Sequence, residues 1–156
     1  MKNVNFAQTK DKMKINLKNG IDKLLFGMLQ KDVIALYGKP TKSYKDEDDN
    51  VILLYNEQKW RLTFYVEEGL KLGYIVSSNE NLTLSDIKII GKSMDVVQTE
   101  LGPKGLTKWE EESFDTYENY FNEDFWMIVQ TEFGYAVKVE LGAIIKNDEF
   151  EWKFKK

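Results

Sequence analysis

Apolar and polar side chains alternate along two groups of segments, and this period of two predicts β-strands with one buried face. The first group is expected to form an antiparallel meander over residues 51–55, 60–66 and 70–76, with turns at 56–57 and 68–69. The remaining strands are expected at residues 13–17 (an edge strand), 117–121, 125–133, 135–141 and 150–154.

A short helix is expected before each group of strands. In residues 30–37, Val33, Ile34 and Tyr37 form an apolar stripe, and Gly38 follows as a C-terminal stop. The corresponding features of the second helix are the N-cap Ser93, the apolar Val96, Val97 and Leu101, and the terminal Gly102-Pro103.

The order of these elements predicts an internal duplication. Gly27 and Gly38 recur 64 residues later as Gly91 and Gly102, and strands of matching length follow in the same order. We therefore expect an α+β fold in which two tandem helix-plus-meander repeats form one mostly antiparallel sheet packed by short helices. The expected boundaries are a flexible tail at 1–12 and a single domain at 13–156, with repeats at about 20–80 and 85–145 and a terminal strand at about 149–154.

Composition removes several classes of chemistry. The 156 residues include no Cys and no His, which excludes thiolate nucleophiles, catalytic triads and His-based zinc sites. No phosphate-binding loop or paired-carboxylate motif stands out, so we expect a protein that is not an enzyme and has no cofactor.

Charge is distributed unevenly. Residues 1–23 hold six Lys and two Asp, whereas the rest of the chain holds 16 basic and 24 acidic residues, a balance of −8. Such a body disfavours nucleic acid, because phosphate binding depends on clustered Lys and Arg. It favours a basic protein as the partner.

The start of the chain is polar and rich in Lys, without the apolar run of a secretory signal, and no apolar stretch reaches the length of a membrane span. We therefore expect a cytoplasmic protein with no membrane partner.

Two glycine-bounded motifs, GMLQKDVIALYGKP and GKSMDVVQTELGP, carry a resemblance to known families. Each resembles the helix-then-sheet unit of outer-membrane assembly lipoproteins of the SmpA/OmlA type. The tandem arrangement is similar to that of the β-lactamase inhibitory proteins, which implies an architecture and a bias toward protein binding. A small, acidic, Cys-free domain is also similar in general character to the immunity proteins that neutralise bacterial toxins.

A polar run at 46–50 has part of the spacing of a calcium-binding loop. With Asp46 as position 1, Asp48, Asn50 and Glu57 occupy positions 3, 5 and 12 of an EF-hand. Val51 stands where that loop requires Gly, and strands follow instead of a helix, so the sequence favours a solvated loop and no metal site.

Residues 109–137 combine acidic and aromatic side chains. They hold eight carboxylates, no Lys or Arg, and nine of the 21 aromatic residues. Aromatic anchors inside a charged rim are typical of binding hot spots. We predict a partner-binding surface made of Glu110, Glu111, Glu112, Asp115, Tyr117, Glu118, Tyr120, Glu123, Asp124, Trp126 and, from the first group of strands, Tyr65.

The strand at 125–133 divides this surface from the core. Its period places Trp126 and Ile128 on the polar face, exposed unless the helices or the tail cover them. The residues expected on the buried face are Phe125, Met127, Val129 and Phe133.

The sequence thus predicts a non-enzymatic binding protein that occludes a basic partner, with a nuclease-like toxin domain as the best-motivated target. Two alternatives stay open. One is a structural or assembly module that binds a protein through its sheet edges, and the other is a small-molecule or calcium-binding domain.

Overall fold

The structure is a computed structural model that describes residues 13–155, so the tail expected at residues 1–12 lies outside the described residues. Within the described part, strands predominate and two short α-helices accompany them. The α+β class expected from the sequence is therefore confirmed, with the strands mostly antiparallel.

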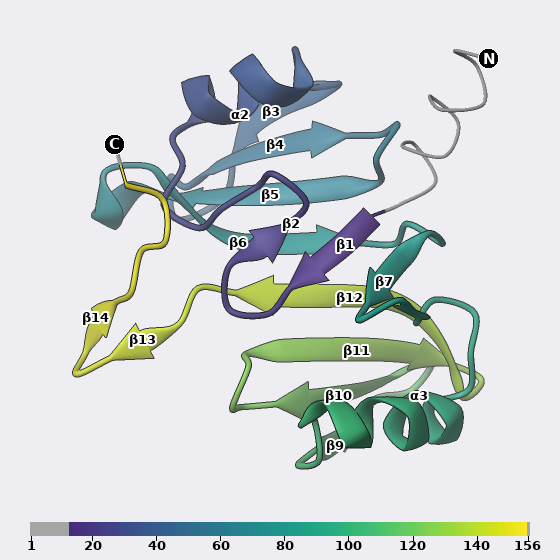
Figure 1. Ribbon diagram of the computed structural model, residues 1–156. Coiled ribbons are helices and arrows are strands. Elements are labelled where there is room, and N and C mark those ends of the chain that lie inside the picture. The colour runs from purple at the N-terminus through teal and green to yellow at the C-terminus, as the bar shows by residue number, and fades with distance from the viewer. Residues whose placement is uncertain (1–12, 156) are drawn as a thin grey trace, which may run out of the picture.

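An eight-stranded antiparallel sheet forms the main layer of the molecule (Figure 1). In spatial order its strands are β3 (Lys42–Lys45), β4 (Val51–Tyr55), β5 (Trp60–Tyr65), β6 (Lys71–Ser77), β12 (Tyr135–Gly142), β11 (Met127–Glu132), β10 (Glu118–Asn122) and β9 (Glu110–Ser113).

Two consecutive four-stranded meanders meet at the middle of this sheet. Strands β3 to β6 follow one another on one side, and β9 to β12 on the other. The last strands of the two meanders pair with each other, with Ile75 opposite Leu141 and Ser77 opposite Val139. A single antiparallel junction therefore joins the two halves of the sheet.

The two edge strands were not expected from the sequence. All four residues of β3 (Lys-Ser-Tyr-Lys) and all four of β9 (Glu-Glu-Glu-Ser) are exposed, so neither has the alternation that reveals a half-buried strand. Each meander consequently has four strands where the pattern predicts three. The charges of the two edges are opposite, and charged edges oppose pairing with a like edge of another molecule.

Two helices and a small second sheet cover one face of the large sheet (Figure 1). The helices are α2 (Gln30–Tyr37) and α3 (Met94–Leu101), both as predicted, and 3₁₀ turns occur at Val66–Glu68 and Gly102–Lys104. The small sheet contains β2 (Gly20–Ile21), β1 (Met13–Asn16), β7 (Leu82–Leu84) and β8 (Ile87–Lys88), in that order. Strand β1 is therefore an inner strand and not the edge strand expected.

The core lies between these layers. One cross-strand row of the large sheet runs through residues that are at most 2% exposed. Its members are Leu53, Leu62, Ile75, Leu141 and Met127. From the covering layer, Val33 of α2 and Val97 of α3 join the same buried cluster.

Three residues expected in the core are exposed. Ile34 and Val96 are 39% and 43% exposed, because each short helix buries a narrower stripe than the pattern suggests. Phe133 is 94% exposed. Its strand shifts register between Gln130 and Thr131, and Phe133 then enters the turn before β12 with a φ of 53°.

The C-terminal segment packs beside one end of the sheet. Its hairpin pairs β13 (Ile145–Lys146) with β14 (Glu149–Phe150). The strand expected over 150–154 ends at Phe150, but the amides of Lys153 and Phe154 both donate to the Phe26 carbonyl oxygen at 3.0 Å. Within the described residues, no helix has the length and apolar character that spanning a membrane requires.

Replacing Ile75 by alanine should destabilise the protein by about 2–5 kcal/mol, because the side chain is fully buried at the central junction and its removal leaves a cavity. Urea unfolding followed by circular dichroism measures the loss. The control is Ile145→Ala, whose parent side chain is 52% exposed and whose effect should stay within about 0.5 kcal/mol. Equal effects of the two substitutions would contradict this placement of the core.

Candidate functional site

The face of the large sheet opposite the helices presents a mixed apolar and charged surface. One row of directly paired residues crosses all eight strands on this face, beginning with a carboxylate and ending with an ammonium group. In order, the row contains Glu110, Phe121, Ile128, Glu140, Val76, Arg61, Leu54 and Lys42. We call this surface the open face.

An aromatic cluster occupies the open face over the second meander. The Trp126 ring packs edge to face with Phe121 at a centroid distance of 5.2 Å and with Tyr74 at 5.6 Å. Gly142 makes this packing possible, because a Cβ at that position would lie 2.6 Å from Cε3 of Trp126. The Trp126 backbone has a φ of 50°, so it lies in the turn before β11.

A carboxylate lies beside this cluster near the centre of the sheet. The Tyr74 hydroxyl donates a hydrogen bond to the Glu140 carboxylate, and the Lys138 ammonium lies 3.8 Å from the same carboxylate. Burial raises the pKa of Tyr74 above its ordinary value, and the hydrogen bond to Glu140 raises it further. The Tyr74 hydroxyl therefore remains a neutral donor at all physiological pH values.

A hollow of about 540 Å³ lies between this cluster and the acidic edge strand β9. In the pairing of β9 with β10, Glu110 lies opposite Phe121 and Glu112 opposite Asn119, so all four share the open face. The hollow is lined by Glu110, Glu111, Glu112, Asn119, Phe121, Trp126 and Ile128. We call it the β9 groove.

Two of the predicted binding residues, Tyr120 and Glu118, lie on the opposite, helix-covered side. Tyr120 packs against the core, and the Glu118 carboxylate accepts a hydrogen bond of 2.6 Å from the Thr131 hydroxyl. Burial, followed by the nearby carboxylates of Glu111 and Glu118, raises the pKa of Tyr120. Tyr120 and Glu118 therefore have structural partners, and Glu111 lies at the rim between the two sides.

The other predicted acidic residues lie at loops. Asp115 is in the bend between β9 and β10, where Tyr117 stacks on Phe114 at a centroid distance of 4.6 Å. Glu123 and Asp124 occupy the turn between β10 and β11 and line another hollow with Lys108, Trp109 and Glu110, so Glu110 borders both this hollow and the β9 groove.

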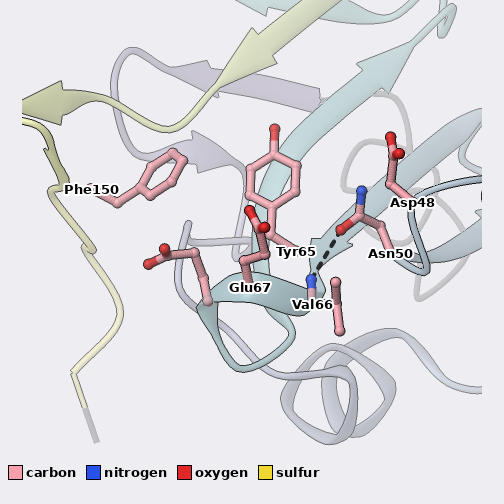
Figure 2. A pocket seen from close by; sticks show the side chains of 7 residues that line it. Asp48, Asn50, Tyr65, Val66, Glu67 and Phe150 are labelled. Carbon is pink, nitrogen blue, oxygen red and sulfur yellow. Dashed lines mark hydrogen bonds between the residues drawn. The ribbon is translucent and has the colours of Figure 1, made fainter.

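Tyr65 belongs to β5 and does not line the β9 groove; it lines a second hollow of about 510 Å³ (Figure 2). Its ring covers Gly73, where a Cβ would lie 2.2 Å from the ring, and faces Phe150 at a centroid distance of 5.7 Å. Asp48, Asn50, Val66, Glu67 and Glu68 complete the lining, and the Val66 amide donates to Asn50 Oδ1 at 3.0 Å. The predicted surface is thus divided into separate parts.

Sequence reasoning missed five residues of the open face: Tyr74, Asn119, Phe121, Glu140 and Gly142. A strict period of two along residues 70–76 would place Tyr74 on the same face as the buried Leu72, but the register shift between Thr63 and Phe64 turns it outward. The glycine was a usable signal, since a glycine within a strand often marks the close approach of another group.

The polar run at 46–50 has a structural role. The Asp46 carboxylate accepts hydrogen bonds from the amides of Asp48 and Asn50 at 2.9 and 3.0 Å, which close the turn between β3 and β4. Within residues 13–155, no group of three or more acidic side chains is arranged to hold a metal ion.

No family model and no curated protein sequence matches the chain. Two solved structures are similar. One is an extracellular protein containing a SCP domain from Bacillus anthracis str. Ames (14% identity, TM-score 0.46), and the other a cysteine-rich secretory protein from Staphylococcus aureus subsp. aureus Mu50 (13%, 0.45). Each similarity covers 74% of this chain, which spans only 43% and 44% of those proteins. TM-scores below 0.5 support no inference about activity.

Two expectations are corrected by this comparison. The resemblance to SmpA/OmlA-type lipoproteins and β-lactamase inhibitory proteins is wrong, because both similar structures are SCP-domain or cysteine-rich secretory proteins. The expected cytoplasmic location is contradicted as well, because these proteins are described as extracellular or secretory. The glycine-bounded helix motifs were too short to identify a family.

Replacing Gly142 by alanine should destabilise the protein by about 1–3 kcal/mol, because the new methyl group forces the Trp126 ring away from the sheet. Urea unfolding measures the loss, and the Trp126 indole resonance should move. Gly102→Ala is the matched control, since nothing lies within 4 Å of its added Cβ and its φ of −53° suits alanine. A destabilisation by Gly102→Ala as large as that by Gly142→Ala would contradict this role of the glycine.

Folding stability should fall as the pH rises above about 10. The unfolded chain releases the Tyr74 proton near the ordinary pKa of 10.0, whereas the folded state holds it to higher pH. The contribution of Tyr74 is therefore fully present below this value and is lost above it. In Tyr74→Phe, the urea midpoint should fall less steeply between about pH 9.5 and 11. The control Tyr135→Phe, at a side chain 55% exposed, should keep the wild-type slope, and equal slopes in all three proteins would refute the assignment.

Proposed function

We propose that this protein is a non-enzymatic binding module that occludes a basic protein partner. The observation that carries the proposal is the β9 edge, where Glu110, Glu111 and Glu112 are consecutive and exposed, next to an aromatic cluster. None of the three takes part in an ion pair within the described residues. A cationic partner would supply the missing counter-charges.

The charge distribution supports a fast encounter with such a partner. Clustered charges of one sign raise association rates, whereas buried aromatic side chains slow dissociation. Trp126, Tyr74 and Phe121 are the aromatic side chains available at this edge, and tryptophan and tyrosine are enriched among the residues that dominate binding energy.

A toxin of the nuclease type is the partner class that fits these features best. A nuclease cleft is cationic because it must bind phosphates, and a surface with several unpaired carboxylates can occupy it. On this proposal the module acts as an immunity or inhibitor protein, and it needs no chemistry of its own.

We further propose that the two halves of the chain are tandem repeats. Gln30 and Met94 begin the two helices at an offset of 64 residues. The same offset relates Ile75 to Val139 and Ser77 to Leu141, and these residues form the two reciprocal pairs Ile75–Leu141 and Val139–Ser77. Reciprocal pairing of this kind is what a two-fold relation between two copies of one unit would produce.

A binding module that uses its sheet edge through the backbone is the second candidate. It is favoured by one observation, the exposure of all four residues of β9 at the end of the sheet. In that mode, main-chain hydrogen bonds supply the affinity, so the side-chain charges matter little. The two candidates therefore differ in their response to charge reversal.

The test uses the product of the adjacent reading frame if it encodes a basic, toxin-like domain. Titration calorimetry should detect a complex whose affinity falls with salt. The triple substitution of Glu110, Glu111 and Glu112 by Lys should weaken it at least about ten-fold, since like charges then face the partner. Growth of cells that express the toxin should be rescued by the wild type and not by the variant.

The control variant reverses Glu47, Asp48 and Asp49, which are exposed in the turn between β3 and β4. It changes the net charge by the same amount, so a local effect of β9 predicts near-wild-type affinity for this control. If both variants weaken the complex equally, the effect is due to net charge and not to the position of the β9 carboxylates. Unchanged binding in the β9 variant would refute the electrostatic interface and favour backbone pairing at the edge.

A further inference from the structure

We infer that the β9 groove is a receptor for an arginine side chain of the partner, an inference that rests on the proposed function and names its anchor. The groove joins three chemical features that a guanidinium group requires together: an aromatic wall, a pair of carboxylates and an additional acceptor. Of the hollows lined by Tyr65, Trp60, Trp109 and Trp126, only that of Trp126 joins an aromatic wall to both a buried unpartnered acceptor and two carboxylates of an edge strand.

The aromatic wall is held in place by its surroundings. Trp126 is fixed between the rings of Phe121 and Tyr74 and lies directly on Gly142. The Tyr74 hydroxyl is anchored in turn by Glu140. A planar guanidinium stacks on such rings and is also attracted to them as a cation, and little aromatic motion must be lost on binding.

The two carboxylates face the groove from the same strand. Glu110 and Glu112 are two residues apart on β9, so both side chains point to the open face, and each lies opposite a groove residue of β10. Neither takes part in an ion pair or side-chain hydrogen bond within the described part of the chain. Charge-assisted hydrogen bonds to a guanidinium are among the strong ones in proteins.

The additional acceptor is the side-chain oxygen of Asn119. This atom is buried and has no hydrogen-bond partner in the described structure, although the residue lines the groove. An unsatisfied buried acceptor destabilises the free protein, and a donor that arrives with a ligand removes this cost.

Together these features favour arginine over lysine. Arginine has five N–H donors in a fixed plane, which can serve Glu110, Glu112 and Asn119 while the plane stacks on Trp126. The lysine ammonium is compact and strongly hydrated, so it can satisfy a carboxylate but not the whole set. The second hollow, beside Tyr65, has acidic residues but no buried unpartnered acceptor, and it serves as an internal control.

The test uses three blocked amino acids as probes: N-acetyl-arginine amide, N-acetyl-lysine amide and N-acetyl-trimethyllysine amide. Their binding is followed by ¹H–¹⁵N NMR of the Trp126 indole and the Asn119 side-chain amide, with the indole signal assigned by its loss in Trp126→Phe. The arginine probe should shift both signals and bind at least about five-fold tighter than the lysine probe, since only it supplies the full set of donors. The trimethyllysine probe, which keeps the charge without donors, should bind more weakly than arginine.

Variants separate the three features. Asn119→Asp should tighten arginine binding by adding an acceptor and a charge, whereas Asn119→Leu should weaken it. Glu110→Gln combined with Glu112→Gln should abolish the preference for arginine. Glu67→Gln with Glu68→Gln, at the Tyr65 hollow, should leave binding unchanged. Circular dichroism confirms that each variant is folded.

Equal dissociation constants for arginine and lysine, tightest binding of trimethyllysine, or shifts centred on Tyr65 would each overturn the inference. These outcomes are distinct from a failure of the proposed function. If the groove shows no preference for arginine but the complex with the basic partner still depends on the β9 charges, only the arginine receptor is refuted. An arginine-selective groove in a protein whose β9 charges do not affect the complex would refute the proposed mode of inhibition.

Discussion

The pairing of β6 with β12 is the interaction on which the rest of the structure depends. Each meander alone would end in an unpaired, largely apolar inner strand, which is a site for aggregation. Pairing these two strands with each other removes both edges and leaves as edges only the short, charged β3 and β9. The same junction places Ile75 and Leu141 in the middle of one core row and Val76 and Glu140 in the middle of the open face.

The open face illustrates how local chain geometry creates hollows on the surface of a sheet. Two aromatic rings, Tyr65 and Trp126, each lie over a glycine of a neighbouring strand, and these glycines, Gly73 of β6 and Gly142 of β12, lie at the same end of the central strand pair. The glycine has no side chain and so leaves room for the ring, and the ring provides apolar surface. Hollows therefore form beside the rings while the strands remain paired. The carboxylates of β9 then give one hollow a chemical preference.

Much of the fold could be predicted because burial leaves a period in the sequence. The strands β4 to β6 and β10 to β12, as well as α2, follow from alternation and glycine stops. The edges β3 and β9 could not be predicted, since a strand exposed on every residue has no period. For the candidate site, the sequence indicated which types of residue are present, but it did not indicate how they are arranged in space. Glu110, Glu112 and Trp126 do meet on one face, whereas Tyr120 and Glu118 lie on the other and Tyr65 lies in a different hollow. Cross-strand register and two bulges decide this, and neither can be read from spacing along the chain.

The opposite charges of β3 and β9 give the large sheet an electric polarity along its hydrogen-bonding direction. Neighbouring strands lie about 4.8 Å apart, so the two poles are separated by roughly 34 Å. This distance exceeds the screening length of about 8 Å in physiological salt, so the poles do not neutralise one another. A charged molecule at close range would therefore be attracted to one edge of the sheet and repelled by the other. This difference in electrostatic potential would orient the molecule before contact.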